Sequence, residues 1–315
     1  MKPQVIVVGS FVQDLTWNCQ QFPQAGETII GTFSTGPGGK GSNQAVAAGR
    51  AGASTLFVGA VGADTFAAGA KAFYKAEKIS ARFIEKRGHA TGTAAILVSA
   101  TGQNEIVVAL GANARLSKAD LPSMLFTGGQ VVVTQLESSL IAATTALKAA
   151  HAAGAFAVLN PAPMRADFDP AILRHADILI PNETEFAALV NLLPVTGIKD
   201  FTEQQLATLE HDDIHALARA FGPPVVIVTL GKRGCLVSQD TGHTFIPSHK
   251  VKAVDTTGAG DAFVGGFAAG LVKFDGDLLA AARFGTVVAA LSVTKRGTAP
   301  AMPRAREITA FLKKK

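Results

Sequence analysis

Short apolar runs alternate with alanine-rich segments along most of this 315-residue chain. Each run is rich in β-branched residues and ends at Gly, Pro or Asn, which is typical of a buried strand. The predicted strands are Val5–Val8, Thr55–Val61, Val131–Gln135, Phe156–Asn160, Ile178–Pro181 and Pro224–Leu230. The predicted helices between them are Ser42–Ala51, Asp64–Lys78, Ser138–Ala153, Asp213–Phe221, Gly260–Phe274 and Leu278–Val293. This alternation predicts an α/β fold in which helices cover both faces of a mostly parallel sheet.

Composition and charge exclude several classes of partner. Hydrophobic residues make up 48% of the chain and charged residues 17%, so a large aliphatic core is expected. The net charge is +5, but the basic residues are scattered and cluster only at Lys313–Lys315. Without a basic stripe interleaved with aromatics, no nucleic-acid partner is expected. The apolar run Val5–Val8 is too short for a signal segment or a membrane span, so we expect a cytoplasmic protein. Cys19 and Cys235 fit no metal or disulfide pattern and are predicted to be reduced thiols.

Two stretches, at about residues 11–37 and 91–111, differ from this pattern. Polar and apolar residues alternate in them between turn residues, which predicts β segments joined by turns. Such hairpins do not suit a buried parallel sheet and predict a small β appendage that covers one end of it. The polar segment Leu193–Asp213 is predicted to be a surface excursion. His211 and His215 lie four residues apart near its end, but without the Glu of a zinc protease helix they are assigned to a solvated face.

A glycine turn, Asp255–Asp261, runs directly into an apolar helical segment. The small residues Gly258, Ala259 and Gly260 let backbone N–H groups converge on an anion, and the helix that follows adds its positive end. Asp261 lies in the first helical turn, where it faces whatever carries the anion. The turn therefore predicts a site for phosphoryl transfer. Taken alone, it also fits an ordinary helix with a side-chain N-cap.

A second glycine cluster, Gly36–Asn43, precedes the first predicted helix. A dinucleotide-binding fold would place such a pattern directly after the first strand, so an NAD-dependent dehydrogenase is disfavoured. A Walker A loop is also excluded, because Lys40 is followed by Gly41 where Ser or Thr is needed. What is left is a loop rich in backbone N–H groups, in which Lys40 and Asn43 are suited to bind a polyhydroxyl ligand.

Polar residues follow several predicted strands at their carboxyl ends, where open α/β sheets bind ligands. They are Asp14, Glu137, Asn182, Glu185, Thr229 and Gly231. Each has an alternative role as a cap or turn residue. For Asn182 and Glu185 the alternative is a capping arrangement ahead of the next helix.

Together these motifs resemble the ribokinase family of sugar kinases, also called the PfkB carbohydrate kinases. Gly39–Arg50 is similar to the first family signature and Asp255–Asp261 to the second, and the resemblance covers essentially the whole chain. The motifs between them follow in family order: Gln135–Ser138, Asn160–Pro163, Pro181–Glu185 and Thr229–Gly234. Several are more similar to ribokinases and deoxyribokinases than to other members.

The resemblance implies a doubly wound sheet in a single domain over residues 1–315. It also implies that segments 11–37 and 91–111 form a β lid through which two subunits clasp as a homodimer. The implied substrates are a sugar and ATP, and the implied cofactors are Mg2+ and K+.

The resemblance also assigns roles to individual residues. Those similar to sugar-binding residues are Asp14, Gly39, Lys40, Gly41, Asn43, Glu137 and Asp261. Those matching nucleotide contacts are Asn182, Glu185, Thr229, Gly231, Gly234, Gly260 and Thr286, and Asn182 and Glu185 also help to place Mg2+. The K+ ligands map to Asp255, Thr257, Ser292, Lys295, Gly297 and Ala301, several through backbone carbonyls. Asp261 is the implied base, and the amides of Gly258–Gly260 hold the developing charge.

The predicted activity is ATP-dependent phosphorylation of the C5 hydroxyl of a pentose, with ribose first and 2-deoxyribose second. Val12 stands two positions before Asp14, where ribokinases carry Asn, and its side chain cannot hydrogen-bond a hydroxyl. This departure fits a pocket for 2-deoxyribose or another pentose, although apolar contacts reject an extra hydroxyl only weakly. Thr286 likewise replaces a His or Asn near the adenine. The alternatives are another carbohydrate or nucleoside kinase of the family and a catalytically inactive sugar-binding regulator, which the intact Asp261 disfavours.

Overall fold

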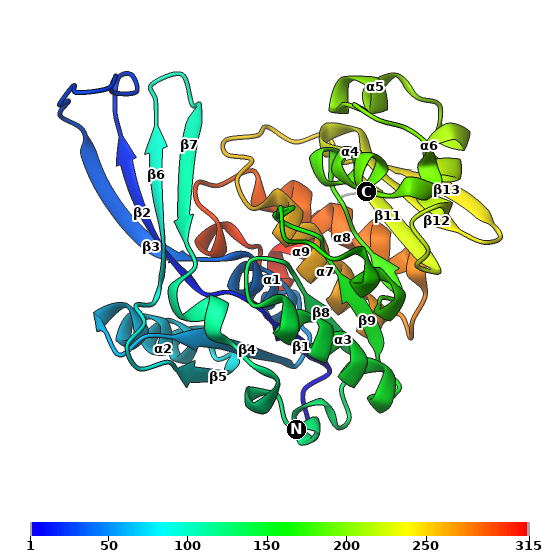
Figure 1. The fold of residues 1–315 in the computed structure, drawn as a ribbon, viewed down its shortest axis with the longest axis horizontal. Helices are drawn as coiled ribbons and strands as arrows, with labels where there is room; N and C mark the ends of the chain where they lie inside the picture. The colour runs from blue at the N-terminus through cyan, green and yellow to red at the C-terminus, as the bar shows by residue number, and fades with distance from the viewer. Residues whose placement is uncertain (1, 314–315) are drawn as a thin grey trace.

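The computed structural model describes residues 2–313 (Figure 1). Its main sheet has nine strands in the order β13-β12-β11-β10-β9-β8-β1-β4-β5. β1 (Val5–Val8) pairs in parallel with both β4 (Thr55–Val61) and β8 (Val131–Thr134). From β1 the chain winds one way through β4 to β5 (Ser80–Glu85) and later the other way through β8. The predicted doubly wound arrangement is confirmed.

Beyond β8 the sheet continues in parallel through β9 (Phe156–Leu159), β10 (Ile178–Leu179) and β11 (Val225–Thr229). It ends in an antiparallel hairpin of β12 (Gly234–Gln239) and β13 (Gly242–Pro247). Neither this hairpin nor β5 was predicted from the sequence. An edge strand such as β5 carries charged residues among its apolar ones, which hides the strand pattern.

The helices surround this sheet. They are α1 (Lys40–Arg50), α2 (Thr65–Glu77), α3 (Leu140–Ala153), α4 (Glu183–Leu192), α5 (Glu203–Thr208), α6 (His211–Arg219), α7 (Ala259–Lys273), α8 (Leu278–Ser292) and α9 (Ala305–Leu312). All six predicted helices are present with small shifts at their ends. The predicted surface excursion contains α5 and the start of α6. His211 and His215 are not on a solvated face: the ring of His211 stacks on Phe245, and His215 bonds to Ser238 through Nδ1, at 2.7 Å from Oγ.

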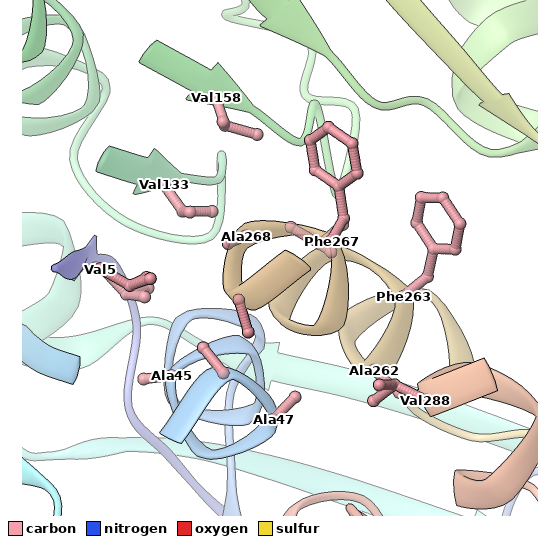
Figure 2. Close-up of a cluster of buried hydrophobic side chains, with 14 of the residues drawn as sticks. Val5, Ala45, Ala47, Val133, Val158, Ala262, Phe263, Phe267, Ala268 and Val288 are labelled. Atoms are coloured by element: carbon pink, nitrogen blue, oxygen red, sulfur yellow. The ribbon is translucent and has the colours of Figure 1, made fainter. Parts of the chain in front are cut away.

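Alternate residues of β1 face opposite layers of helices. Val5 and Val7 face a core built with α1, α2, α7 and α8, whereas Ile6 and Val8 face one built with α3, α4 and α6. Figure 2 shows the first of these cores. Within it α1 and α7 lie very close, because a Cβ at Gly265 would lie 2.3 Å from the carbonyl oxygen of Gln44. This approach fixes the start of α7 against the start of α1.

A second sheet of four strands, in the order β3-β2-β6-β7, stands apart from the main sheet at the upper left of Figure 1. It is made of β2 (Val12–Asn18), β3 (Thr32–Gly38), β6 (Gly92–Val98) and β7 (Asn104–Ala109). Each segment forms an antiparallel pair, and β2 and β6 join the two pairs in parallel. A separate small sheet is therefore present where it was predicted, and its role as a lid stays a prediction.

No helix within residues 2–313 is long and apolar enough to cross a bilayer. Of the basic cluster Lys313–Lys315, only Lys313 belongs to the described residues. Cys19 and Cys235 are both free thiols, as predicted.

Candidate active site

A cavity of about 210 Å³ opens at the carboxyl ends of β9, β10 and β11. The N-termini of α1, α4 and α7 point into the same region. The cavity is lined by Lys40, Asn160, Ala162, Ile180, Asn182, Glu185, Thr229, Thr256, Gly258, Ala259, Gly260, Asp261 and Val264. Open α/β sheets bind ligands at this end of their strands, so the cavity is the candidate active site.

The N-terminus of α7 forms one wall of the cavity. Gly258 is the N-cap residue with φ 78°, a conformation that favours glycine. No side chain among residues 2–313 caps this helix, so the ordinary side-chain cap considered for the motif is not found. Gly258, Ala259 and Gly260 all line the cavity. An uncapped helix N-terminus with small residues is suited to hold a phosphate group.

Asp261 lies in the first turn of α7 and is 8% exposed. Its Oδ2 accepts a hydrogen bond of 2.9 Å from Nδ2 of Asn43, and its Oδ1 accepts one of 3.0 Å from Nε2 of Gln44. These bonds join the two glycine signatures, which are more than two hundred residues apart in sequence. Gln44 was not among the predicted site residues, because in the sequence it reads only as one position of a helix.

The glycine loop and Glu137 meet at the start of α1. The carboxylate of Glu137 accepts hydrogen bonds from the backbone N–H of Lys40, at 2.8 Å, and from Oγ of Ser10, at 2.6 Å. Ser10 also accepts a bond of 3.3 Å from the N–H of Gly41. The negative charge of Glu137 therefore stabilises the positive N-terminal end of α1, next to the glycine loop of the site. Ser10 was missed, although it follows β1 at a strand-end position.

Asp14 reaches the site from the small sheet. Its carboxylate lies so close to Gly38 that a Cβ there would be 2.3 Å from Oδ2. Oγ1 of Thr298 donates to the same oxygen over 3.4 Å. Burial and the charges of Glu137 and Asp261 raise the pKa of Asp14 to about 7. Thr298 was also missed, because the contact spans nearly the whole chain.

Carboxylates dominate the electrostatics of the site. Burial raises the pKa of Glu137 and of Glu185, although Lys40 opposes the rise in both cases. For Lys40 itself burial lowers the pKa, but Asp261, Glu137 and Glu185 outweigh burial and raise it. Lys40 therefore stays charged. A site with this excess of carboxylates is suited to a ligand that arrives with cations.

Asn182 and Glu185 form a capping box at the start of α4. The N–H of Glu185 donates to Oδ1 of Asn182 over 2.8 Å, and the N–H of Asn182 donates to Glu185 over 2.9 Å. The capping alternative is thus present, yet both residues also line the cavity. No cluster of three or more His, Cys, Asp or Glu suited to a metal exists within residues 2–313. A single carboxylate such as Glu185 still fits Mg2+, which in phosphate sites takes one or two carboxylates together with phosphate oxygens and water.

The other predicted nucleotide residues spread beyond the cavity. Thr229 lines it, whereas Gly231, Gly234 and Thr286 do not. Gly234 has φ 126°, and a Cβ there would lie 2.0 Å from the carbonyl oxygen of Ile246 in the neighbouring strand. The need for glycine at this position therefore comes from the β12–β13 hairpin. Oγ1 of Thr286 donates to the carbonyl of Arg283 over 2.7 Å.

The residues predicted to bind K+ lie on two segments that the structure brings together. The carboxylate of Asp255 accepts hydrogen bonds of 2.9 Å from the N–H groups of Thr257 and Gly297. Burial opposes ionisation of Asp255, but these two N–H groups outweigh burial and hold its pKa below the ordinary value. Lys295 extends to Glu307 and forms an ion pair with it. One ionised carboxylate beside a loop with backbone carbonyls is a donor set that fits a monovalent cation.

The remaining two members of this set, Ser292 and Ala301, make local bonds. Oγ of Ser292 donates to the carbonyl of Ala289 over 2.8 Å, and the N–H of Ala301 donates to the carbonyl of Thr298 over 3.0 Å.

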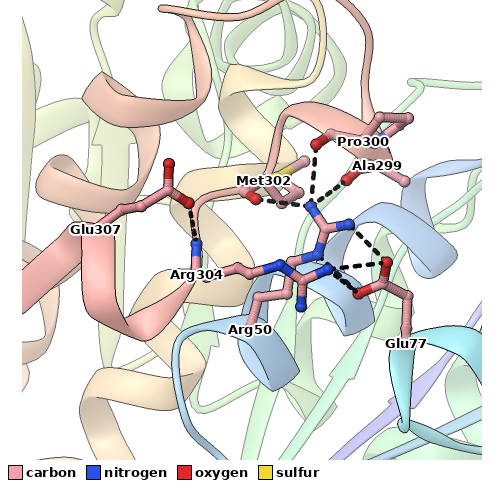
Figure 3. A network of polar contacts seen from close by, with 7 residues as sticks. All are labelled: Arg50, Glu77, Ala299, Pro300, Met302, Arg304 and Glu307. Carbon is pink, nitrogen blue, oxygen red and sulfur yellow. Dashed lines mark hydrogen bonds and ion pairs between the residues drawn. The ribbon is translucent and has the colours of Figure 1, made fainter.

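Arg50 holds the loop that contains Ala301 (Figure 3). Its Nη1 donates to the carbonyls of Ala299, Pro300 and Met302 at 3.1, 3.0 and 2.7 Å. Its Nε and Nη2 donate to Glu77 at 2.9 and 2.7 Å. No individual role was predicted for Arg50, since a basic residue in the last turn of a helix is common.

Comparison with known proteins agrees with this geometry. The model of the pfkB family carbohydrate kinases matches residues 2–305. The chain is 37% identical to ribokinase from Mus musculus over 96% of this chain and 93% of that protein. It is 35% identical to deoxyribokinase from Salmonella typhi over 98% of both. The structure of Arabidopsis thaliana ribokinase complexed with ribose and ATP superposes with a TM-score of 0.84, at 29% identity and 99% coverage of each chain. The predicted family and enzyme class are confirmed, and the chain belongs to the pfkB family of carbohydrate kinases.

Proposed function

We propose that this protein transfers the γ-phosphate of ATP to the C5 hydroxyl of a pentose, with D-ribose as the first candidate. The observation that carries the proposal is Asp261, a carboxylate in the first turn of an uncapped helix, beside the amides of Gly258–Gly260. A proton acceptor and an anion site thus lie on one helical turn. The named activity of the mouse ribokinase and the ribose and ATP bound to the Arabidopsis enzyme support the choice of substrates.

In the proposed reaction, Asp261 accepts the proton of the C5 hydroxyl as its oxygen attacks the γ-phosphorus in line. The amides of Gly258–Gly260 and the end of α7 stabilise the charge that develops on the phosphoryl oxygens. Because the transition state is loose, correct placement of the two substrates contributes more than the base does. Glu185 and Asn182 would hold Mg2+, which when bound would neutralise phosphate charge.

On the sugar side, we assign hydroxyl contacts to Asp14, Gly39, Lys40, Gly41, Asn43 and Glu137. On the nucleotide side, we assign one contact to Thr229, which lines the cavity. Further nucleotide contacts outside the cavity are assigned to Gly231, Gly234 and Thr286. K+ is proposed as an activator bound by Asp255, Thr257, Ser292, Lys295, Gly297 and Ala301. We also propose a cytoplasmic location, because ATP is a cytoplasmic metabolite.

A second candidate substrate, 2-deoxy-D-ribose, is favoured by Val12. Its side chain is 2% exposed and apolar, so it offers the sugar no hydrogen bond. The similarity to a deoxyribokinase supports the same choice.

The small sheet is proposed to act as a lid and as a dimer interface. Large apolar side chains on it are left exposed, namely those of Trp17, Phe33, Ile106, Val107 and Val108. Its outer strands β3 and β7 have no further strand beside them within residues 2–313. The strand register puts Trp17, Phe33 and Val107 on one face of the sheet and Ile106 and Val108 on the other. Exposed apolar side chains gathered on one face mark an interaction surface, and a second copy of the same sheet would cover the face with Trp17, Phe33 and Val107.

An assay of ADP release tests the function. D-ribose, 2-deoxy-D-ribose, other pentoses, fructose and nucleosides are compared, with and without Mg2+ and K+. We expect ADP release that requires both a pentose and Mg2+ and that K+ increases. Absence of release with every acceptor favours a sugar-binding regulator, and a change in nicotinamide absorbance favours a dehydrogenase.

A further inference from the structure

A network of buried amide side chains is hydrogen-bonded to Asp261. Nε2 of Gln44 donates to Oδ1 of Asp261 and to Oδ1 of Asn160, both over 3.0 Å. Oε1 of Gln44 accepts a bond of 2.6 Å from Nε2 of Gln135. Asn160 in turn donates to the carbonyl of Ile180 over 2.8 Å. Both hydrogens and the oxygen of the Gln44 amide are therefore engaged.

Two groups that can only accept hydrogen bonds, the Ile180 carbonyl and the Asp261 carboxylate, fix the direction of each hydrogen bond in this network of amides. The carbonyl of Ile180 can only accept, so Asn160 must turn its nitrogen toward it and its oxygen toward Gln44. An ionised carboxylate also only accepts, so Gln44 must present its nitrogen to Asp261. Gln135 then donates to the remaining oxygen of Gln44. One arrangement therefore satisfies every bond between these four groups, and such a network holds its members rigidly. Oε1 of Gln135, at the outer end of the network, has no hydrogen-bond partner within residues 2–313.

Gln44 has no access to a ligand. Its side chain is 0% exposed, and it is absent from the lining of the cavity. Neighbouring Asn43, which holds Oδ2 of Asp261, is 4% exposed and does not line this cavity either, but it is one of the proposed sugar contacts. When a sugar hydroxyl enters, Asn43 can exchange its bond to Oδ2 for one to the sugar. The bond from Gln44 to Oδ1 has no such competitor.

We propose that Gln44 is a positioning residue that holds Oδ1 of Asp261 and so makes Oδ2 the oxygen that accepts the proton. The inference rests on the proposed kinase function. In the step, the C5 oxygen forms a bond to the γ-phosphorus while the bond from that phosphorus to the leaving oxygen of ADP breaks. The hydroxyl proton passes to Oδ2. Without Gln44, and with Asn43 bonded to the sugar instead of Oδ2, the carboxylate plane is free to rotate, and Oδ2 no longer faces the hydroxyl.

Gln44→Met keeps the length of the side chain but removes both donors, and kinetics test its effect. Misplacement of a reacting group by about 1 Å costs roughly 100-fold in rate, so we expect kcat to fall by about 10- to 100-fold. The KM values for sugar and ATP should change little, because Gln44 touches neither substrate. Gln135→Met should cause a smaller loss of kcat, since Gln44 then keeps its bond to Asp261 but loses the partner of its oxygen.

A double-mutant cycle separates positioning from general structural damage. If Gln44 acts through Asp261, Gln44→Met causes no further loss of kcat in an Asp261→Asn background. An equal loss in both backgrounds, or an unchanged kcat in the single variant, would overturn the proposal. A loss that appears only in KM would do the same.

Crystal structures of the wild type and of Gln44→Met, each with the sugar bound, provide a test that does not depend on activity. The proposal expects the Asp261 carboxylate to rotate in the variant, whereas an unmoved carboxylate overturns the proposal. Failure of the kinase function itself would show in the wild type alone, as absence of sugar-dependent ADP release. The two failures are therefore distinguishable. If Gln44→Met does not fold, Gln135→Met carries the kinetic test: the smaller fall in kcat at unchanged KM supports the proposal, and an unchanged kcat overturns it.

Discussion

At the scale of single residues, every carboxylate of the site has its own set of partners. Asp261 is bonded by two side-chain amides, Glu137 by a backbone N–H and a hydroxyl, and Glu185 by Asn182. Asp14 has only the long contact from Thr298. Hydrogen bonds to an ionised carboxylate favour its charged form. Because of this difference we expect Asp14 and Asp261 to respond differently to substitution.

Asp261→Asn should abolish most turnover while leaving sugar binding intact. A general base contributes about 100- to 10,000-fold in rate, and the amide that replaces it still fills the same space. Steady-state ADP release and calorimetric titration with the sugar measure the two effects. Asp275→Asn, in an exposed residue just beyond the other end of α7, is the matched control. A variant at position 261 with near-normal kcat would rule out Asp261 as the base.

Asp14→Asn should stabilise the ligand-free protein more at pH 8 than at pH 5. Burial, Glu137 and Asp261 raise the folded-state pKa of Asp14 to about 7, so the folded protein binds this proton more tightly than the unfolded chain. Stability from this group is present at low pH and is lost as the pH rises toward 7. Each pKa unit corresponds to about 1.4 kcal/mol, and we expect a difference of at least that size between the two pH values. Urea unfolding of both proteins measures it, and a difference independent of pH would contradict the assignment.

The candidate residues divide by the kind of signal that they carry in the sequence. Asp14, Glu137 and Asn182 were found because they follow strands, and the topology of the sheet brings strand ends together. Gln44 carries no such signal, and Ser10 was missed although it follows β1. Their roles depend on contacts with residues far away in sequence, and only the folded chain shows those contacts.

At the scale of elements, α1 connects two parts of the site. It begins at the glycine loop, where Glu137 and Ser10 bond to its first N–H groups. It ends at Arg50, which holds the loop of the proposed cation site. Close packing of α1 against α7 then places Asn43 and Gln44 on Asp261.

Arg50→Met should destabilise the protein strongly. Arg50 and Glu77 form an ion pair with side-chain exposures of 8% and 9%, and removal of one partner of such a buried pair costs about 3 to 5 kcal/mol. Arg304 also pairs with Glu77 but is 51% exposed. Arg304→Met is therefore the control, with an expected loss below about 1 kcal/mol. Chemical denaturation of both variants gives the comparison, and equal losses would show that burial of the Arg50 pair is unimportant.

Helices and strands whose apolar residues recur at one regular spacing were predictable from the sequence. Elements that depend on contacts with neighbouring elements were not. β1 and β4 have the bounds that their β-branched runs predicted. The antiparallel β12 and β13 were missed, because a strand at the border of a sheet takes its partner from tertiary packing. α5 was missed because its few residues are mostly polar.

At the scale of the whole molecule, the small sheet provides the proposed contact with a second subunit. Val107→Asp places a charge on its surface at a residue that is 73% exposed in the single chain. We expect the wild type to be a dimer and this variant to be a monomer in sedimentation analysis. Ile141→Asp, at a residue of α3 that is 66% exposed and far from the small sheet, should leave the dimer unchanged. A wild type that sediments as a monomer would exclude the proposed interface.

The small sheet is built from two insertions into the main fold, and each contributes one antiparallel pair. A two-stranded hairpin alone is only marginally stable in water. The parallel contact between β2 and β6 makes the two pairs a single sheet, so deletion of either insertion leaves the other without support. We therefore expect related kinases to have kept or lost the two insertions as one unit. Any exchange of this sheet between related kinases has to move both pieces together.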